Sequence, residues 1–327
     1  MVAHAIECGT GTLEAIFSLH RDQLESRARQ HRTPSRATNQ RRTRESLTLR
    51  TAQQCMPTLT GKYLVRESIG KGAFGHVYRA LDRSTGQEVA LKLLQSRHAY
   101  SASLAARFLR EGRALQRLNH SGIVRIYELF REKRALGLAM EFVRGRTLEE
   151  SLIEVGSFAP AEVARIGHEL CSALAAVHGA GFVHRDIKAE NIIQRPSGEV
   201  VLLDFGITRS VDNAHQLTVD GMLVGTPLSM APEQHEFLPI DGRTDLYAVG
   251  CLLYQLLTAR HPVEGHNLAE LRRRVLEADY PPVRELRPAV PAELAEVVGR
   301  AMACHPDDRF QTAREVESAL RAVLATA

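Results

Sequence analysis

The segment from His184 to Asn191, with the sequence HRDIKAEN, gathers side chains that could act together on a phosphate group. The carboxylate of Asp186 could accept the proton of an attacking hydroxyl, and Lys188 adds a positive charge two residues later. Asn191 and Asp204 offer the hard oxygen ligands that Mg²⁺ prefers. Phosphoryl transfer needs positioning and charge neutralisation more than covalent catalysis, and this set of side chains fits that chemistry.

A glycine-rich segment precedes this set. Residues 70–77, GKGAFGHV, have the pattern G-x-G-x-x-G-x-V, which alone fits a dinucleotide fold as well as a phosphate-covering loop. A dinucleotide fold places a helix after the glycines, whereas a strand pattern follows here. We therefore expect a β-hairpin whose glycines let the backbone approach phosphates.

Lys92 and Glu111 complete the set of candidate charged residues. Lys92 lies on the next predicted strand, 17 residues after Gly75, and is one of only five lysines in the chain. Its ammonium group would contact phosphate oxygens, and Glu111 on the following helix would hold it in an ion pair. An isolated strand Lys or helical Glu is more often a solvated side chain, so both assignments depend on the other motifs.

The order of these motifs resembles the eukaryotic-like protein kinase family. HRDIKAEN is followed by Asp204-Phe205-Gly206 and then by Ala231-Pro232-Glu233, in the order and spacing of the kinase signature. The resemblance covers about residues 61–325. The sequences VALK, DFGI and GTPLSMAPEQ are similar to those of the bacterial branch of the family. It implies an ATP-dependent enzyme with Mg²⁺ or Mn²⁺ as cofactor. Asp186 would accept the proton of the attacking hydroxyl, and Asn191 and Asp204 would be the metal ligands.

The resemblance also implies the acceptor and the nucleotide pocket. Lys188, together with Thr226 in Gly225-Thr226-Pro227, is similar to the serine/threonine subgroup, so Ser and Thr residues of proteins are the expected substrates, with autophosphorylation. Met140 falls at the gatekeeper position. The remaining nucleotide-binding positions are Ile69, Gly70, Lys71, Gly72, Ala73, Phe74 and Gly75 around the phosphates, and Val77, Ala90, Glu141, Val143 and Ile193 around adenine.

Further matches are structural or regulatory. Leu115, His184 and Phe205 resemble members of the regulatory spine, which makes His184 structural and not a base. Glu233 and Arg309 resemble the buried ion pair of the large lobe, and Asp245 resembles the Asp that orients the catalytic loop. Ala189 departs from the family, where Pro is common, and touches no chemistry. Arg185 would pair with a phosphorylated activation-loop residue, for which Thr218 is the candidate.

The elements that must position these residues form an α+β, bilobal kinase fold. Strand-like runs fill residues 61–140, interrupted by a helical period at 101–118. After about residue 146 the period is mainly helical, with apolar helices at 161–178, 247–258 and 294–302 and one strand pair around 191–204. We expect a small lobe at about 61–140, a hinge at 141–145 and a large lobe at 146–325.

Composition limits the other functions. Residues 1–60 contain nine arginines and five acids and so carry the whole net charge of +4, while residues 61–327 are neutral. We interpret 1–60 as a largely disordered tail, with Met56 as an alternative start. Because residues 61–327 have no net charge, a nucleic-acid-binding fold is disfavoured. Five scattered cysteines and the lack of a long apolar run predict a cytoplasmic chain without a membrane span.

Three alternatives stay open at this point. A pseudokinase scaffold would lack at least one of the residues Lys92, Glu111, Asp186, Asn191 and Asp204, and all five are present. A small-molecule kinase would lack the APE segment and the Thr-Pro loop. A module in which the tail binds nucleic acid or an acidic partner would use the arginines of residues 1–60.

Overall fold

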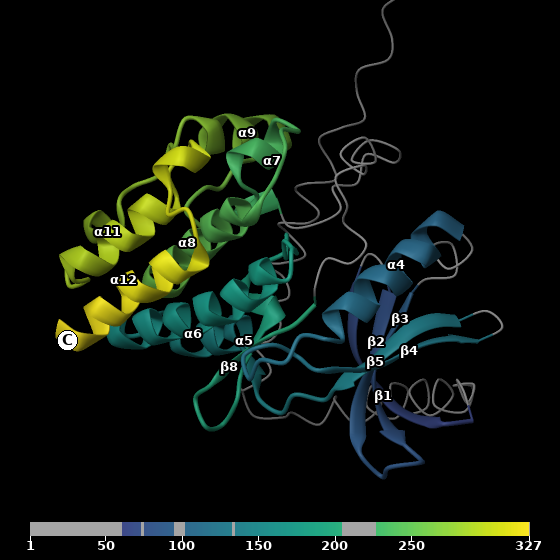
Figure 1. Ribbon diagram of the computed structural model, residues 1–327. Coiled ribbons are helices and arrows are strands. Elements are labelled where there is room, and N and C mark those ends of the chain that lie inside the picture. Colours follow the sequence, from purple (N-terminus) through teal and green to yellow (C-terminus); the bar gives the residue numbers. More distant parts are fainter. Residues whose placement is uncertain (1–60, 73–74, 95–101, 133–134, 205–226, 327) are drawn as a thin grey trace, which may run out of the picture.

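The N-terminal part of the protein is an antiparallel sheet with one helix beside it (Figure 1). The computed structural model describes residues 61–72, 75–94, 102–132, 135–204 and 227–326. The strands are β1 (Tyr63–Gly72), β2 (Gly75–Asp82), β3 (Glu88–Leu94), β4 (Ile126–Glu132) and β5 (Ala135–Glu141), in the order β1-β2-β3-β5-β4. The predicted hairpin after the glycines is therefore confirmed: Gly72 pairs with Gly75 across the turn between β1 and β2.

Helix α4 (Ala102–Leu115) lies between β3 and β4 in the chain and packs near β4. Its apolar residues Ala105, Phe108 and Leu115 are each less than 5% exposed. This spacing of three and seven residues places them on one helical face, which contacts the sheet. Arg110, Arg113 and Arg117 lie on or just after the exposed remainder of the helix.

The C-terminal part is mainly helical. Its helices are α5 (Leu148–Val155), α6 (Pro160–Gly179), α7 (Pro232–His235), α8 (Gly242–Thr258), α9 (Leu268–Leu276), α10 (Val283–Leu286), α11 (Ala292–Ala301) and α12 (Ala313–Thr326). Three short turns of 3-10 helix are Ala189–Asn191, Pro227–Ser229 and Pro306–Asp308, and a small sheet holds β6 (Arg146–Thr147), β7 (Ile192–Gln194) and β8 (Val200–Leu202).

Helix α8 forms the centre of this part, because every residue from Thr244 to Leu257 is buried. It begins five residues before the apolar run that predicted it at 247. Asp241 explains the earlier start, since its side chain accepts a hydrogen bond from the N–H of Arg243 and caps the helix. Helices α6, α11 and α12 each contact α8, and α12 also contacts α6 and α11 (Figure 1).

The two parts are joined by more than the predicted hinge. The expected strand from 123 begins only at Ile126, because the preceding residues pair with the helical part instead: Ile123 forms a parallel bridge to Leu202 of β8. The N–H of Val124 donates to the carbonyl of Leu202 (3.0 Å), and the N–H of Leu202 donates to the carbonyl of Gly122 (2.9 Å). The chain therefore contacts β8 before it enters β4.

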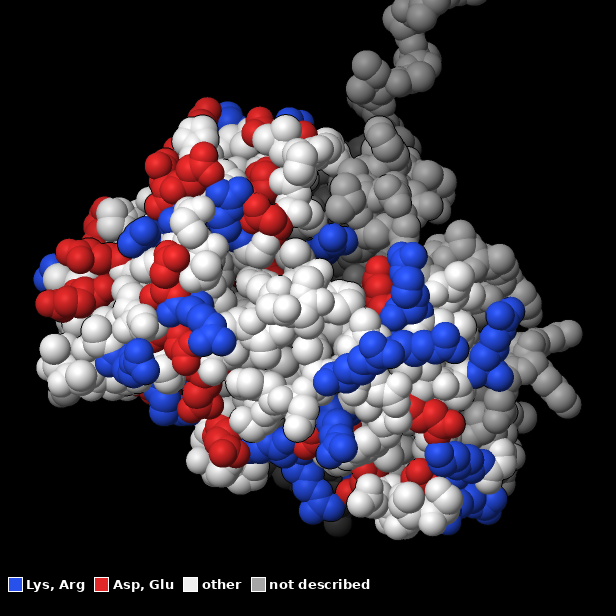
Figure 2. Space-filling view, in the orientation of Figure 1, with Lys and Arg blue, Asp and Glu red and all other residues white. Residues whose placement is uncertain are grey.

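Both acidic and basic side chains lie on the visible surface, around a central area without them (Figure 2). Figure 2 shows acidic and basic side chains intermixed on this face. Within the described residues, no helix is both long enough and apolar enough to span a membrane. The cysteines of the described part, Cys171, Cys251 and Cys304, form no disulfide.

Candidate active site

The catalytic-loop segment brings three predicted side chains together. The side-chain nitrogen of Asn191 donates to the carboxylate of Asp186 (2.9 Å) and to its backbone carbonyl (2.8 Å). The ammonium group of Lys188 lies 3.8 Å from the other carboxylate oxygen of Asp186. Because Asn191 uses its nitrogen toward Asp186, its side-chain oxygen is the atom left to bind a metal ion.

Asp245 holds the backbone of the catalytic loop by hydrogen bonds. Its carboxylate is 1% exposed and accepts the N–H groups of His184 and Arg185, both at 2.7 Å. Arg185 has a φ of 66°, in the left-handed region that non-glycine residues rarely adopt. The two hydrogen bonds hold this strained conformation, so the predicted orienting contact of Asp245 is confirmed.

His184 has a structural place, as predicted. Its side chain is fully buried, and Nε2 donates to the carbonyl of Leu203 (2.8 Å). Its Nδ1 accepts the N–H of Asp186 at 3.3 Å, which fixes the Nε2–H tautomer. Both ring nitrogens are thus used to connect the catalytic loop with the segment that leads to Asp204, and neither is available as a base.

Lys92 reaches the same centre from the sheet. It lies on β3 between Val77 of β2 and Leu138 of β5, and its ammonium group forms an ion pair with Asp204. This pair joins the predicted phosphate-binding Lys to the predicted metal-binding Asp across the two parts of the molecule. Glu111 is half-buried on α4, and its ion pair with Lys92 stays a prediction.

The glycines of the hairpin differ in how much space surrounds them. Gly70 has room, since an added Cβ would be in ordinary contact with Val77 at 3.7 Å. At Gly75 an added Cβ would lie 2.1 Å from the backbone carbonyl oxygen of Leu93. Gly75 is therefore required by the close approach of β2 to β3, independently of any ligand. Ile69 is 45% exposed, and Lys71 is exposed beside it.

The predicted adenine-contacting residues gather in one apolar cluster. Ala90, Met140 and Val143 are each less than 9% exposed within it, and Val77 and Ile193 pack against it. These five come from β2, β3, the end of β5, the hinge and β7. Glu141, at the hinge, donates its N–H to the carbonyl of Arg125 (2.8 Å), and its carboxylate accepts a hydrogen bond from Arg195 between β7 and β8.

The donor set near Asp204 fits a hard divalent cation. Asp204 and Asn191 supply a carboxylate and an amide oxygen, and neither a thiolate nor an imidazole is among the predicted ligands. In the described part of the chain, no group of three or more His, Cys, Asp or Glu side chains forms a complete metal cage. A site with two protein ligands suits Mg²⁺, which is usually bound by one or two carboxylates together with substrate phosphates.

The predicted ion pair of the large lobe is confirmed. Arg309 is fully buried and makes two hydrogen bonds of 2.8 Å to the two carboxylate oxygens of Glu233. Burial alone raises the pKa of Glu233, but the hydrogen bonds and charge of Arg309 outweigh it and hold the pKa below 4.5. The pair fixes α7 to the segment before α12.

Several predicted residues lie outside the described part of the chain. They are Ala73 and Phe74 of the glycine-rich loop, Phe205 of the spine, Thr218 and Thr226 of the activation segment, and the tail 1–60.

One contact near the site had no sequence signal. Nε2 of His178, at the end of α6, lies 2.8 Å from the Asp245 carboxylate. His178 is one of 14 histidines in the chain, and it belongs to none of the motifs described above. Only the path of the chain brings it to Asp245.

Comparison with known proteins agrees with this geometry. The model of the protein kinase domain family matches residues 63–319. Serine/threonine-protein kinase PknL of Mycobacterium tuberculosis is 38% identical over 265 residues, which cover 81% of this chain and 66% of that protein. Serine/threonine-protein kinase PrkC of Bacillus subtilis is 32% identical over 263 residues, covering 80% of this chain and 40% of that protein. The chain thus spans less than two thirds of the length of these curated relatives.

A solved structure has the same arrangement. A crystal structure of Rad53 residues 1–466 in complex with AMP-PNP superposes with a TM-score of 0.68 at 25% sequence identity, covering 82% of this chain and 67% of that one. The α+β, bilobal fold predicted from the motifs is therefore confirmed. The family match spans both the sheet that holds Lys92 and the helical part that holds Asp186, so the chain belongs to the protein kinase domain family.

Proposed function

We propose that this chain is a serine/threonine protein kinase that transfers the γ-phosphate of ATP to Ser and Thr hydroxyls of proteins. The observation that carries the proposal is the convergence of two pairs at one place. Lys92 pairs with Asp204, and Asn191 is hydrogen-bonded to Asp186. The N–H of Leu203, which precedes Asp204, donates to the carbonyl of Asn191 (2.8 Å) and so connects the two pairs. Lys92 of the sheet is thereby joined to the loop that carries the other groups that phosphoryl transfer requires.

Each residue has a distinct part in the reaction. The carboxylate of Asp186 accepts the proton of the attacking hydroxyl and orients it. Lys188 and Lys92 place positive charge beside the phosphate oxygens, where negative charge develops. Asn191 and Asp204 hold Mg²⁺ or Mn²⁺, which when bound neutralises phosphate charge. The apolar cluster around Ala90 and Met140 offers the adenine ring a dry surface.

Three features support Ser/Thr residues of proteins as acceptors. Lys188 is the residue type of the serine/threonine subgroup and lies 3.8 Å from Asp186, and Thr226 matches the same subgroup in the sequence. The bacterial relatives are named as serine/threonine-protein kinases. A pseudokinase scaffold is the second candidate, but no residue required for catalysis is replaced. The three cysteines of the described residues form no disulfide, and this supports a cytoplasmic setting.

Incubation with ATP and a basic protein substrate tests this function. We expect Mg²⁺-dependent phosphate incorporation, with mapped sites on Ser and Thr of the substrate and of the enzyme itself. The measurement is mass-spectrometric site mapping, with AMP-PNP and EDTA as controls. Phosphotyrosine as the main product would contradict the acceptor assignment, and the absence of ATP turnover with either metal would contradict the enzyme assignment.

Phosphorylation of Thr218 is the proposed activating event. A phosphate there would pair with Arg185 and order the activation segment. We expect Thr218→Ala to lower kcat about tenfold, because a charge-assisted hydrogen bond is worth about 1.5–3 kcal/mol. Ser210→Ala in the same segment is the control. Turnover by the dephosphorylated Thr218→Ala enzyme equal to that of untreated wild type would contradict the role.

A further inference from the structure

Val143 lies in the middle of the hinge, and its backbone carries two hydrogen-bonding groups without a partner. Among the residues that the structure describes, neither the N–H nor the carbonyl of Val143 is hydrogen-bonded, although the residue is only 7% exposed. Its side chain belongs to the apolar cluster of the predicted adenine position. Buried backbone groups are normally paired, so a ring bound in this cluster would find a donor and an acceptor at Val143.

Arg195 holds the start of the hinge from the helical part. It lies in the turn between β7 and β8, and its guanidinium group forms an ion pair with the carboxylate of Glu141. The turn is itself fixed, because the N–H of Arg195 donates to the carbonyl of Glu199 (2.8 Å). The pair therefore attaches the residue two positions before Val143 to a closed turn of the small sheet.

Arg79 on β2 holds the hinge from the N-terminal sheet. Its guanidinium group lies over the ring of Phe142, 5.0 Å from the centroid, and its Nε donates to one carboxylate oxygen of Glu88 on β3 (2.9 Å). The other oxygen of Glu88 accepts a hydrogen bond from Arg144 (2.8 Å). The residues on both sides of Val143 are thus tied to β2 and β3 through one arginine–glutamate pair.

We propose that Arg195 and Arg79 are positioning residues for adenine, which hold the hinge so that the N–H and carbonyl of Val143 are fixed before the nucleotide binds. This role rests on the proposed function, because adenine binds at the hinge only if the chain uses ATP. Groups that are already in place cost less to order on binding. They also select adenine, since guanine has a donor at N1 and an acceptor at O6 where adenine has an acceptor at N1 and a donor at N6.

Calorimetry with Mg²⁺ and AMP-PNP or GMP-PNP on the full chain tests this role without phosphoryl transfer. Arg195→Ala should weaken AMP-PNP binding about threefold, as the loss of one half-exposed ion pair allows, and leave GMP-PNP binding unchanged. Arg79→Ala should do the same. The double variant should lose about tenfold, because the two arginines share no partner. Arg195→Lys keeps the charge and should regain most of the affinity for AMP-PNP.

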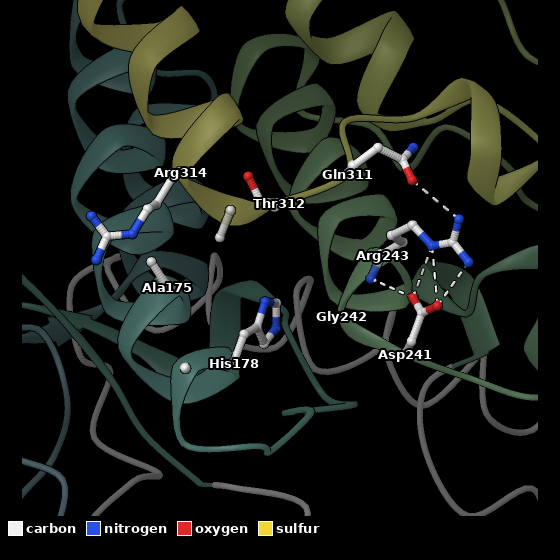
Figure 3. Close-up of a pocket in the computed structure, with 10 residues that line it drawn as sticks. Ala175, His178, Asp241, Gly242, Arg243, Gln311, Thr312 and Arg314 are labelled. Carbon is white, nitrogen blue, oxygen red and sulfur yellow. Dashed lines mark hydrogen bonds and ion pairs between the residues drawn. The ribbon is translucent and has the colours of Figure 1, made fainter.

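Arg243→Ala is the matched control. The side chain of Arg243 is 26% exposed, close to the 28% of Arg195, and it is paired with Asp241 and Asp307 at the start of α8, where Figure 3 shows the bonds to Asp241. Its loss should leave the binding of both nucleotides unchanged. In kinetics, Arg195→Ala should raise the KM for ATP about threefold at an unchanged kcat, since the groups around Asp186 are untouched.

The outcomes separate this role from the proposed function. If wild type binds AMP-PNP, and Arg195→Ala and Arg79→Ala bind it as tightly as Arg243→Ala does, the positioning role is overturned and the kinase function stands. Equal losses for AMP-PNP and GMP-PNP would also overturn it, because they would show general damage to the fold. Wild type that binds neither nucleotide would overturn both. If Arg79→Ala does not fold, the comparison of Arg195→Ala with Arg195→Lys decides.

Discussion

Asp186→Asn is expected to lower kcat by about 10²–10⁴-fold, the usual contribution of a positioned base. The substitution keeps the shape of the side chain, and the amide oxygen of Asn can still accept the hydrogen bond from Asn191 that Asp186 accepts now. The loop geometry should therefore survive while the proton acceptor is lost. Steady-state kinetics with ATP and a protein substrate measure the loss.

Comparing the effects of Asp186→Asn on kcat and on KM shows whether the variant has lost a catalytic group or its fold. The KM for ATP should change little, because Lys92, Asp204 and the adenine cluster are untouched. Asp308→Asn, an exposed aspartate in the helical part, is the matched control and should retain wild-type activity. Equal phosphate incorporation by wild type and Asp186→Asn would refute the proposed function and leave a scaffold as the better explanation.

Arg309→Ala should reduce the free energy of unfolding by about 3–5 kcal/mol, the usual result of breaking a buried ion pair. The guanidinium group is fully buried, bonds both oxygens of Glu233, and also donates to the carbonyls of Ala303, Arg243 and Cys304. The variant leaves the Glu233 carboxylate buried without its partner. Urea denaturation followed by circular dichroism measures the change.

A double variant and a surface control test the cause. Replacing both partners, Glu233→Met with Arg309→Met, should cost less than Arg309→Ala alone, since no charge is then stranded in the interior. Arg321→Ala, on the exposed face of α12, should change stability by less than about 0.5 kcal/mol. If Arg309→Ala proves as stable as Arg321→Ala, the pair is not what fixes α7.

The stability contributed by the Glu233–Arg309 pair should decrease in acid. The pKa of Glu233 is lowered in the folded protein, so its pair contributes fully above about pH 4.5 and is lost as the pH falls through the folded pKa. Acid should therefore reduce the difference in stability between wild type and the double Met variant.

The motifs predicted much of the site because kinase chemistry fixes residue types at fixed spacings. The loop around Asp186, the hairpin at the glycines and the Glu233–Arg309 pair could each be predicted this way. His178 could not, because its role depends on where α6 ends relative to α8. The start of β4 was predicted three residues early, since Ile123 looks like a strand residue whether its partner is in the sheet or in β8. Periodicity reports which residues are apolar and not which neighbour they meet.

The backbone bonds from Gly122 and Val124 to Leu202 have a mechanical consequence. They make a second backbone junction between the two parts of the molecule, in addition to the chain at residues 141–145. Two bodies joined at a single flexible point can rotate about any direction, whereas two separated junctions leave one easy rotation, about the line that connects them. Movement of the sheet that holds Lys92 relative to the loop that holds Asp186 should therefore follow one axis, with twisting of the sheet across the helices suppressed.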